Sequence, residues 1–115
     1  MAQNRNKLIE LFIGNLSNAV LHRILEEAII TREKGLAEKY RKELVTSLSI
    51  AKRYRERINP PDTPLPAKDK EYIKDKVIKK VKAELAVRKA KGYENLQPEL
   101  AEFFAEEALK EILVI

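Results

Sequence analysis

The stretch LAEKYRKELVTSLSIAKRYRERI, residues 36–58, decides the fold class because its apolar residues return every three or four positions. At about 100° per residue, a helix built from this stretch has one apolar and one charged face. The apolar face collects Leu36, Ala37, Tyr40, Leu44, Leu48, Ala51, Tyr54 and Ile58. The charged face collects Lys39, Lys42, Glu43, Lys52, Arg53 and Arg57. The pattern predicts an amphipathic helix that buries one side.

Two further amphipathic helices are predicted on the C-terminal side of this stretch. The apolar face of the first consists of Ile73, Val77, Ile78, Val81 and Leu85. The apolar face of the second consists of Leu100, Phe104, Ala108 and Ile112. Gly92 is suited to end the first of these helices, and Pro98 is tolerated in the first turn of the second. The proline-rich connection 59–66 is predicted to be extended and stiff.

Residues 4–34 form a helical stretch whose apolar stripe changes direction. Leu8 and Phe12 mark one face early in the stretch, whereas Leu21 and Leu25 lie nearly opposite. The change falls at Gly14 to Asn18, where the residues are poor helix formers, so we expect a kink or a break there. A straight helix is the competing interpretation, and it requires packing partners on both sides. Gly35 is expected to end this stretch in a tight turn.

The chain is therefore expected to be all-α, an antiparallel bundle of four main helices. Its 115 residues are close to the common size of one domain, so residues 1–115 are predicted to form a single helical domain. With 44% hydrophobic and 36% charged residues, the composition is that of a globular protein.

Location is predicted from what the sequence lacks. No apolar run approaches the roughly 20 residues needed to span a bilayer, and the N-terminus has no signal-peptide pattern. We therefore expect a cytoplasmic protein. The absence of cysteine and the abundance of Lys, Arg and Glu also fit a thermophilic composition.

Apolar residues at the two ends of the chain are candidates for a protein interface. These residues are Leu8, Ile9, Phe12, Ile13 and Leu16 near the start, and Leu113 and Ile115 at the end. Completion of the chain's own core is the simpler interpretation of the first group, and a second subunit is the alternative.

Basic residues are concentrated away from the C-terminal segment. Residues 1–59 carry 12 basic and 7 acidic groups, whereas residues 97–115 carry 1 and 5. An anion or nucleic-acid contact is a hypothesis for Lys39, Lys42, Lys52, Arg53, Arg57, Lys76, Lys79 and Lys80. The competing interpretation is a solvated face, because many of these cations lie near helix C-termini or one turn from a carboxylate, as in Asp75 with Lys79. The proline connection is too long for a helix-turn-helix, and no aromatic platform for single strands is evident.

No catalytic, metal-binding or cofactor-binding residues are predicted. His22, the single histidine, falls on the polar side of its helix and is expected at the surface. Glu99, Glu102 and Glu106 share a face, but the Glu-x-x-His pair of helical carboxylate metal sites is absent. We therefore expect a non-catalytic interaction module that binds either another protein or a second copy of itself, the latter as a homodimer. The alternative is a basic accessory protein that binds nucleic acid non-specifically through the second and third helices.

Overall fold

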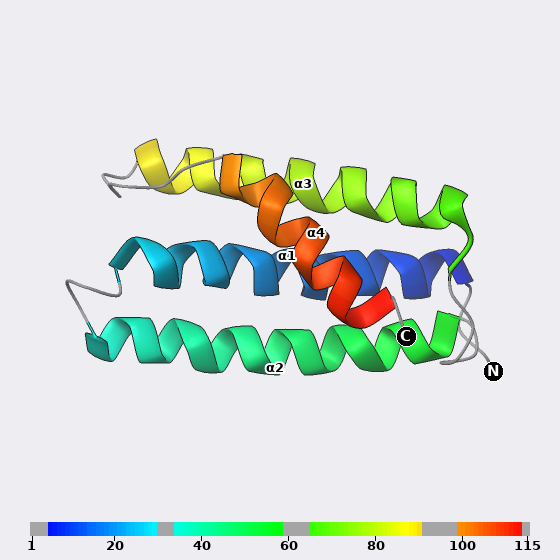
Figure 1. Ribbon diagram of the computed structural model, residues 1–115, viewed down its shortest axis with the longest axis horizontal. Helices are drawn as coiled ribbons and strands as arrows, with labels where there is room; N and C mark the ends of the chain where they lie inside the picture. Colours follow the sequence, from blue (N-terminus) through cyan, green and yellow to red (C-terminus); the bar gives the residue numbers. More distant parts are fainter. Residues whose placement is uncertain (1–4, 30–33, 59–64, 91–98, 114–115) are drawn as a thin grey trace.

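The computed structural model describes residues 5–29, 34–58, 65–90 and 99–113. These ranges contain four α-helices and no strand: α1 (Arg5–Ile29), α2 (Lys34–Ile58), α3 (Ala67–Ala90) and α4 (Glu99–Leu113). The predicted all-α fold of four main helices is confirmed. Successive helices run in opposite directions along the long axis, with α4 crossing obliquely (Figure 1).

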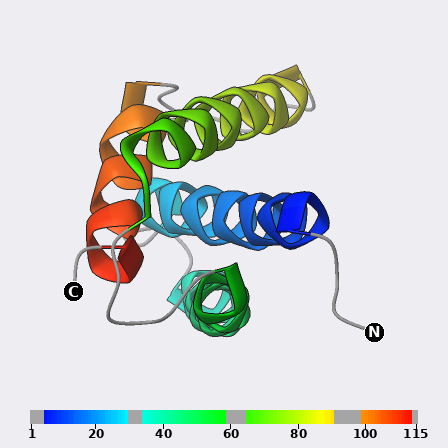
Figure 2. The same cartoon turned by 90° about the vertical axis from the view of Figure 1, so that its right-hand side faces the viewer.

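Helix α1 lies at the centre of the molecule. It packs against α2, α3 and α4, whereas the described parts of α2 and α3 do not touch each other. In Figure 2, α2 and α3 lie on opposite sides of α1 and α4 covers a third side. The fourth side of α1 carries no helix. One core joins all four helices through α1, with Phe12, Leu16 and Ile24 among its most buried side chains.

Of the expected kink or break at Gly14 to Asn18, the break is wrong, because α1 is a single helix through these residues. The apolar stripe changes direction because α1 has packing partners on several sides, as the competing interpretation required. The side chain of Asn15 donates a hydrogen bond from Nδ2 to the carbonyl oxygen of Leu11, 2.9 Å away. This bond satisfies the amide within the helix, so Asn15 does not need to end it.

We predict that Gly14→Ala stabilises the protein by about 0.5–1 kcal/mol, because alanine favours a helix interior over glycine. A Cβ at this position meets no atom within 4 Å. Chemical denaturation measures the effect, and Gly35→Ala, at an equally open position in the first turn of α2, is the control. A loss of stability in Gly14→Ala would contradict the continuous helix.

The other predicted apolar faces are largely confirmed. Ile73, Val77, Val81 and Leu85 of α3 are all buried. In α4 the buried face is rotated from the expected one, since Ala101, Phe104, Ala105 and Leu109 are buried while Leu100 and Ala108 are partly exposed. Ala101 and Ala105 are fully buried at this rotated face.

Two predictions about the connections have different outcomes. Gly35 does not end the first helix, because it lies in the first turn of α2. Most of the proline connection and Gly92 lie outside the described residues. The end of that connection is described: Leu65 is buried in the core, and Lys70 N donates to Pro66 O at 3.0 Å, the first helical bond of α3.

The long, apolar α1 corrects the expectation that no segment approaches membrane-spanning length. Among the described residues, Arg5–Ala28 is one helix long and apolar enough to cross a bilayer. The central helix of a bundle passes the same test, because it is apolar on several sides. Within the most apolar window of α1, 67% is buried inside the protein.

An ion pair joins α3 to α4 at the surface. Lys74 Nζ lies 2.6 Å from Glu106 Oε1. The hydrogen bond from Lys74 lowers the pKa of Glu106 below 4.5, and the same bond raises the pKa of Lys74 above 10.5. A lowered carboxyl pKa stabilises the fold above the unfolded-state value, and this contribution is lost as the pH falls through the folded-state pKa.

We predict that Glu106→Gln lowers the melting temperature at pH 7 and that this difference from wild type disappears well below pH 4.5. Thermal unfolding followed by circular dichroism at both pH values measures it. Asp75→Asn, which removes the exposed Asp75–Lys79 pair within α3, is the control and should have a smaller effect at pH 7. An undiminished difference at acidic pH would contradict the role of this pair.

Candidate functional site

A row of polar contacts runs along the interface between α1 and α2. Asn18 Nδ2 donates to Ser47 Oγ at 3.0 Å, and His22 Nε2 lies 2.6 Å from Glu43 Oε2. One turn further along α1, Glu26 Oε1 lies 3.3 Å from Arg41 Nη1 of α2. Residue numbers rise on α1 as they fall on α2, as antiparallel pairing requires. We call these six residues the polar row.

The expected surface position of His22 is wrong, because its exposure is 8%. The polar side of α1 is covered by α2, which presents Ser47 and Glu43 at this level. Buried polar groups are tolerated when their hydrogen bonds are made, and here the two helices supply partners for each other. No single helix shows this arrangement in its own sequence, because it depends on the register between α1 and α2.

The geometry of His22 argues against serine-type catalysis at the polar row. Its Nδ1 lies 2.7 Å from the carbonyl oxygen of Asn18, and its Nε2 faces Glu43. A catalytic histidine uses one ring nitrogen to accept the serine proton. Here both nitrogens face oxygen acceptors, and Ser47 accepts its bond from Asn18 instead. The polar row therefore holds two helices together.

We predict a coupling free energy of about 0.5–1 kcal/mol between His22 and Glu43 in a double-mutant cycle with His22→Gln and Glu43→Gln. The value is modest because the Glu43 side chain is 43% exposed. Urea unfolding of the wild type, both single variants and the double variant measures it. Additive single effects would show that the contact contributes nothing.

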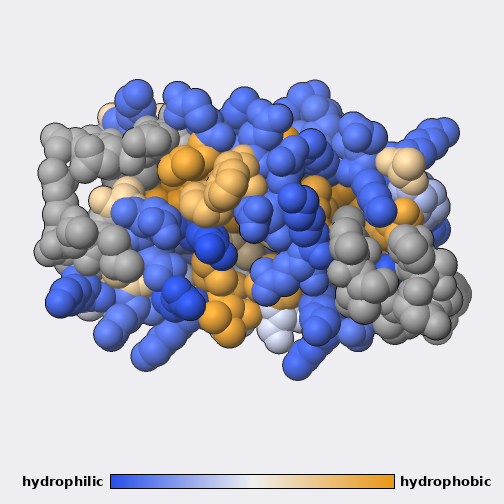
Figure 3. Space-filling model, in the orientation of Figure 1, coloured by the Kyte–Doolittle hydropathy of each residue, from blue (hydrophilic) through white to orange (hydrophobic). Residues whose placement is uncertain are grey.

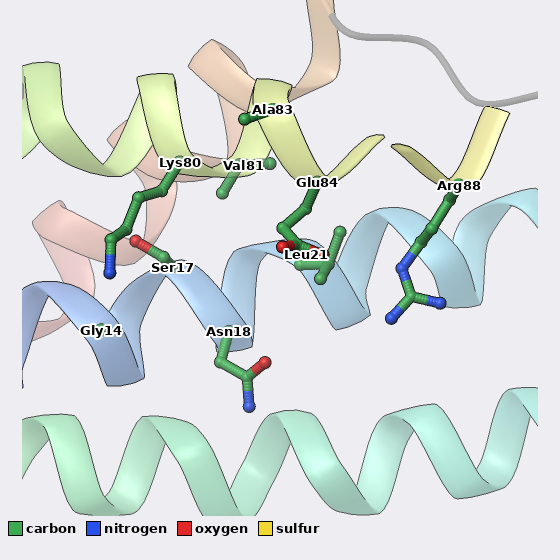
Figure 4. A pocket seen from close by; sticks show the side chains of 9 residues that line it. All are labelled: Gly14, Ser17, Asn18, Leu21, Lys80, Val81, Ala83, Glu84 and Arg88. Atoms are coloured by element: carbon green, nitrogen blue, oxygen red, sulfur yellow. The ribbon is translucent and has the colours of Figure 1, made fainter. Parts of the chain in front are cut away.

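Two adjoining hollows open on the side of α1 that carries no helix. One holds about 390 Å³ and lies between α1 and α3. Figure 4 shows Lys80, Glu84 and Arg88 of α3 above Gly14, Ser17 and Asn18 of α1. The other holds about 240 Å³ between α1 and α2, and both hollows share Asn18. We call this side, with the facing margins of α2 and α3, the open face.

Six of the eight proposed anion contacts lie along the open face. Lys42 and Lys80 line its two hollows. On α2, the helical spacing puts Lys39, Arg53 and Arg57 on the same face as Lys42 and Thr46. On α3, Lys76 is one turn before Lys80. Lys52 and Lys79 do not belong to this face. Lys52 is one turn after Leu48, on the α4 side, and Lys79 is paired with Asp75 at 3.1 Å.

The opposite side of the molecule carries an apolar cleft between α2 and α4. Leu44 and Leu48 of α2 face Phe104 and Ala108 of α4 across it. Two large apolar side chains stand exposed on these helices, Phe103 at 54% and Val45 at 56%. Figure 3 shows apolar areas in the middle of this side, separated by hydrophilic residues. We call this surface the α2–α4 face.

The proposed apolar interface residues of α1 are placed in the chain's own core. Leu8, Ile9, Phe12, Ile13 and Leu16 are all buried against the other helices, so they present no exposed surface in the single chain. The side chain of Leu113 and all of Ile115 lie outside the described residues.

No known protein family matches the chain, and no curated protein or solved structure is significantly similar to it. The site is therefore interpreted from its own geometry.

In the described ranges, no three His, Cys, Asp or Glu side chains gather where they could hold a metal ion. Ser17, Asn18, Ser47 and Arg55 are buried or bridging polar residues that the sequence did not single out. Burial lowers the pKa of Arg55 from its ordinary value.

Proposed function

We propose that this protein is a non-catalytic interaction module that self-associates through its α2–α4 face. The supporting observation is the exposed Phe103 of α4, whose ring centroid lies 5.2 Å from that of Phe104, a residue that lines the apolar cleft. Burying an exposed phenylalanine contributes about 1.5–3 kcal/mol, so an uncovered one beside further apolar residues favours a protein contact. The proposed interface therefore lies on α2 and α4, whereas the sequence-based hypothesis had placed most of it on α1.

The distribution of charge on this face favours a second copy of the chain as the partner. Glu107 and Glu111 line the α4 side of the cleft, whereas Arg23 of α1 lines it as well and Lys52 is one turn after Leu48 on α2. A twofold dimer brings the same surface of both subunits together, so each contact occurs twice. An acidic α4 half can then face a basic α2 half in both directions.

We predict that the wild-type chain forms a dimer in sedimentation equilibrium and that Phe103→Ser weakens it by about ten- to a hundredfold. This range corresponds to a loss of about 1.4–2.8 kcal/mol of association free energy. Tyr72→Ser is the matched control, because Tyr72 is an aromatic residue of similar exposure, 50%, on α3. It should leave the dimer intact.

Two outcomes would contradict the proposal. A wild-type chain that stays monomeric from micromolar to millimolar concentration does not self-associate. A dimer that Tyr72→Ser weakens as much as Phe103→Ser uses another surface. Circular dichroism of each variant shows whether the fold is kept, so a loss of structure is distinguished from a loss of the interface.

This proposal also includes a cytoplasmic location and a thermophilic source for the protein. A cytoplasmic setting is supported by the burial of α1 among the other helices. A thermophilic source rests on composition alone.

A further inference from the structure

The open face carries cations that the protein's own acids do not neutralise. Within the described residues, no carboxylate forms an ion pair with Lys39, Lys42, Arg53 or Lys80. Several carboxylates border this face: Asp69 is paired with Arg5, Glu43 lies against His22, and Glu38 and Glu56 are one turn from Lys42 and Arg53 on α2. Glu84 is an acid within the larger hollow and shares it with Lys80 and Arg88. Cations therefore line both margins, with acids beside them.

The cations form two rows with a neutral floor between them. One row lies on α2 and the other on α3, and α1 separates them because α2 and α3 do not touch. Beside the larger hollow the floor is made by Gly14, Ser17 and Asn18, which carry no charge, and the exposed Glu10 and Lys7 lie one and two turns before Gly14 on the same face of α1. The Oγ of Ser17 is buried and has no hydrogen-bond partner among the described residues. This is a polar trough with basic edges along the length of the bundle.

We propose that the open face binds double-stranded nucleic acid through its phosphates. Two rows of Lys and Arg on either side of an uncharged floor suit a ligand that carries two lines of negative charge. No specific base contact is implied, because lysines that reach phosphates do not read sequence.

Other polyanions fit this face less well. Single strands are held by stacking on aromatic rings, and His22 is the sole aromatic ring among the residues that line the two hollows. An acidic protein segment would need an apolar anchor at the centre of its interface. The large apolar residues that line the hollows, Leu21 and Val81, are already buried in the core.

This inference is independent of the proposed self-association, because the open face and the α2–α4 face lie on different sides of α1. If the chain is a monomer and binds duplex, the nucleic-acid inference holds and the proposed self-association fails. If the chain is a dimer and binds no duplex, the nucleic-acid inference fails.

The test is fluorescence anisotropy with a labelled 20-base-pair duplex, as DNA and as RNA, and the full-length chain between 50 and 200 mM salt. With about four phosphate contacts, we expect affinity to fall about a hundredfold across this range. Lys42→Gln with Lys80→Gln removes one cation from each row. This double variant should weaken binding about tenfold at 50 mM salt and make the salt dependence shallower.

The matched control is Lys79→Gln with Lys82→Gln, which removes the same charge from α3 outside the open face. Lys79 is paired with Asp75, and Lys82 is about 200° around the helix from Lys80. We expect affinity within about twofold of wild type, since only screened long-range attraction is lost.

The proposal is overturned if no duplex binds at 50 mM salt or if the control variant weakens binding as much as the Lys42 and Lys80 variant. It is also overturned if a single strand of the same length binds as tightly, or if polyglutamate of equal charge competes as well as duplex. The last result would identify an acidic polypeptide as the ligand.

Discussion

The packing of α1 against three other helices is the constraint on which the rest of the structure depends. Among the described residues, α2 and α3 do not contact each other, whereas α4 packs against α3 as well as α1, so α1 supplies the surface that joins α2 and α3 in one core. A helix in this position must be apolar on several sides, and α1 buries residues such as Phe12, Val20 and Ile24 in different directions. Removing apolar surface from water is the dominant stabilising contribution of such a core.

The same constraint produces two unlike surfaces. Three neighbours cover three sides of α1 and leave the fourth without a helix, where Gly14 and Asn18 lie between the basic margins of α2 and α3. On the covered side, Phe103 of α4 and Val45 of α2 stay exposed. The proposals for self-association and for nucleic-acid binding each concern one of these surfaces. The polar row keeps α1 and α2 in one register, and this register keeps the two surfaces on different sides of α1.

Much of the fold could be predicted because α2 and α3 bury one face each. For such helices the spacing of Ile73, Val77 and Val81 is enough to identify the core. The same reasoning failed for α1, since a stripe that changes direction indicates either a break or several partners, and a local pattern does not distinguish them. His22 was misplaced because its partners come from α2. The rotation of α4 was missed because Ala101 and Ala105 give little signal. Which basic residues share a face also depends on how α2 and α3 flank α1.

Native-state hydrogen exchange along α1 tests the central claim most directly. If α1 is one continuous helix enclosed by three neighbours, the amides of residues 14–18 should be about as protected as those of residues 9–13 and 19–25, and all should exchange through global unfolding. Exchange at residues 14–18 as fast as at the helix ends would show that α1 opens there. That result would contradict the account of a single central helix.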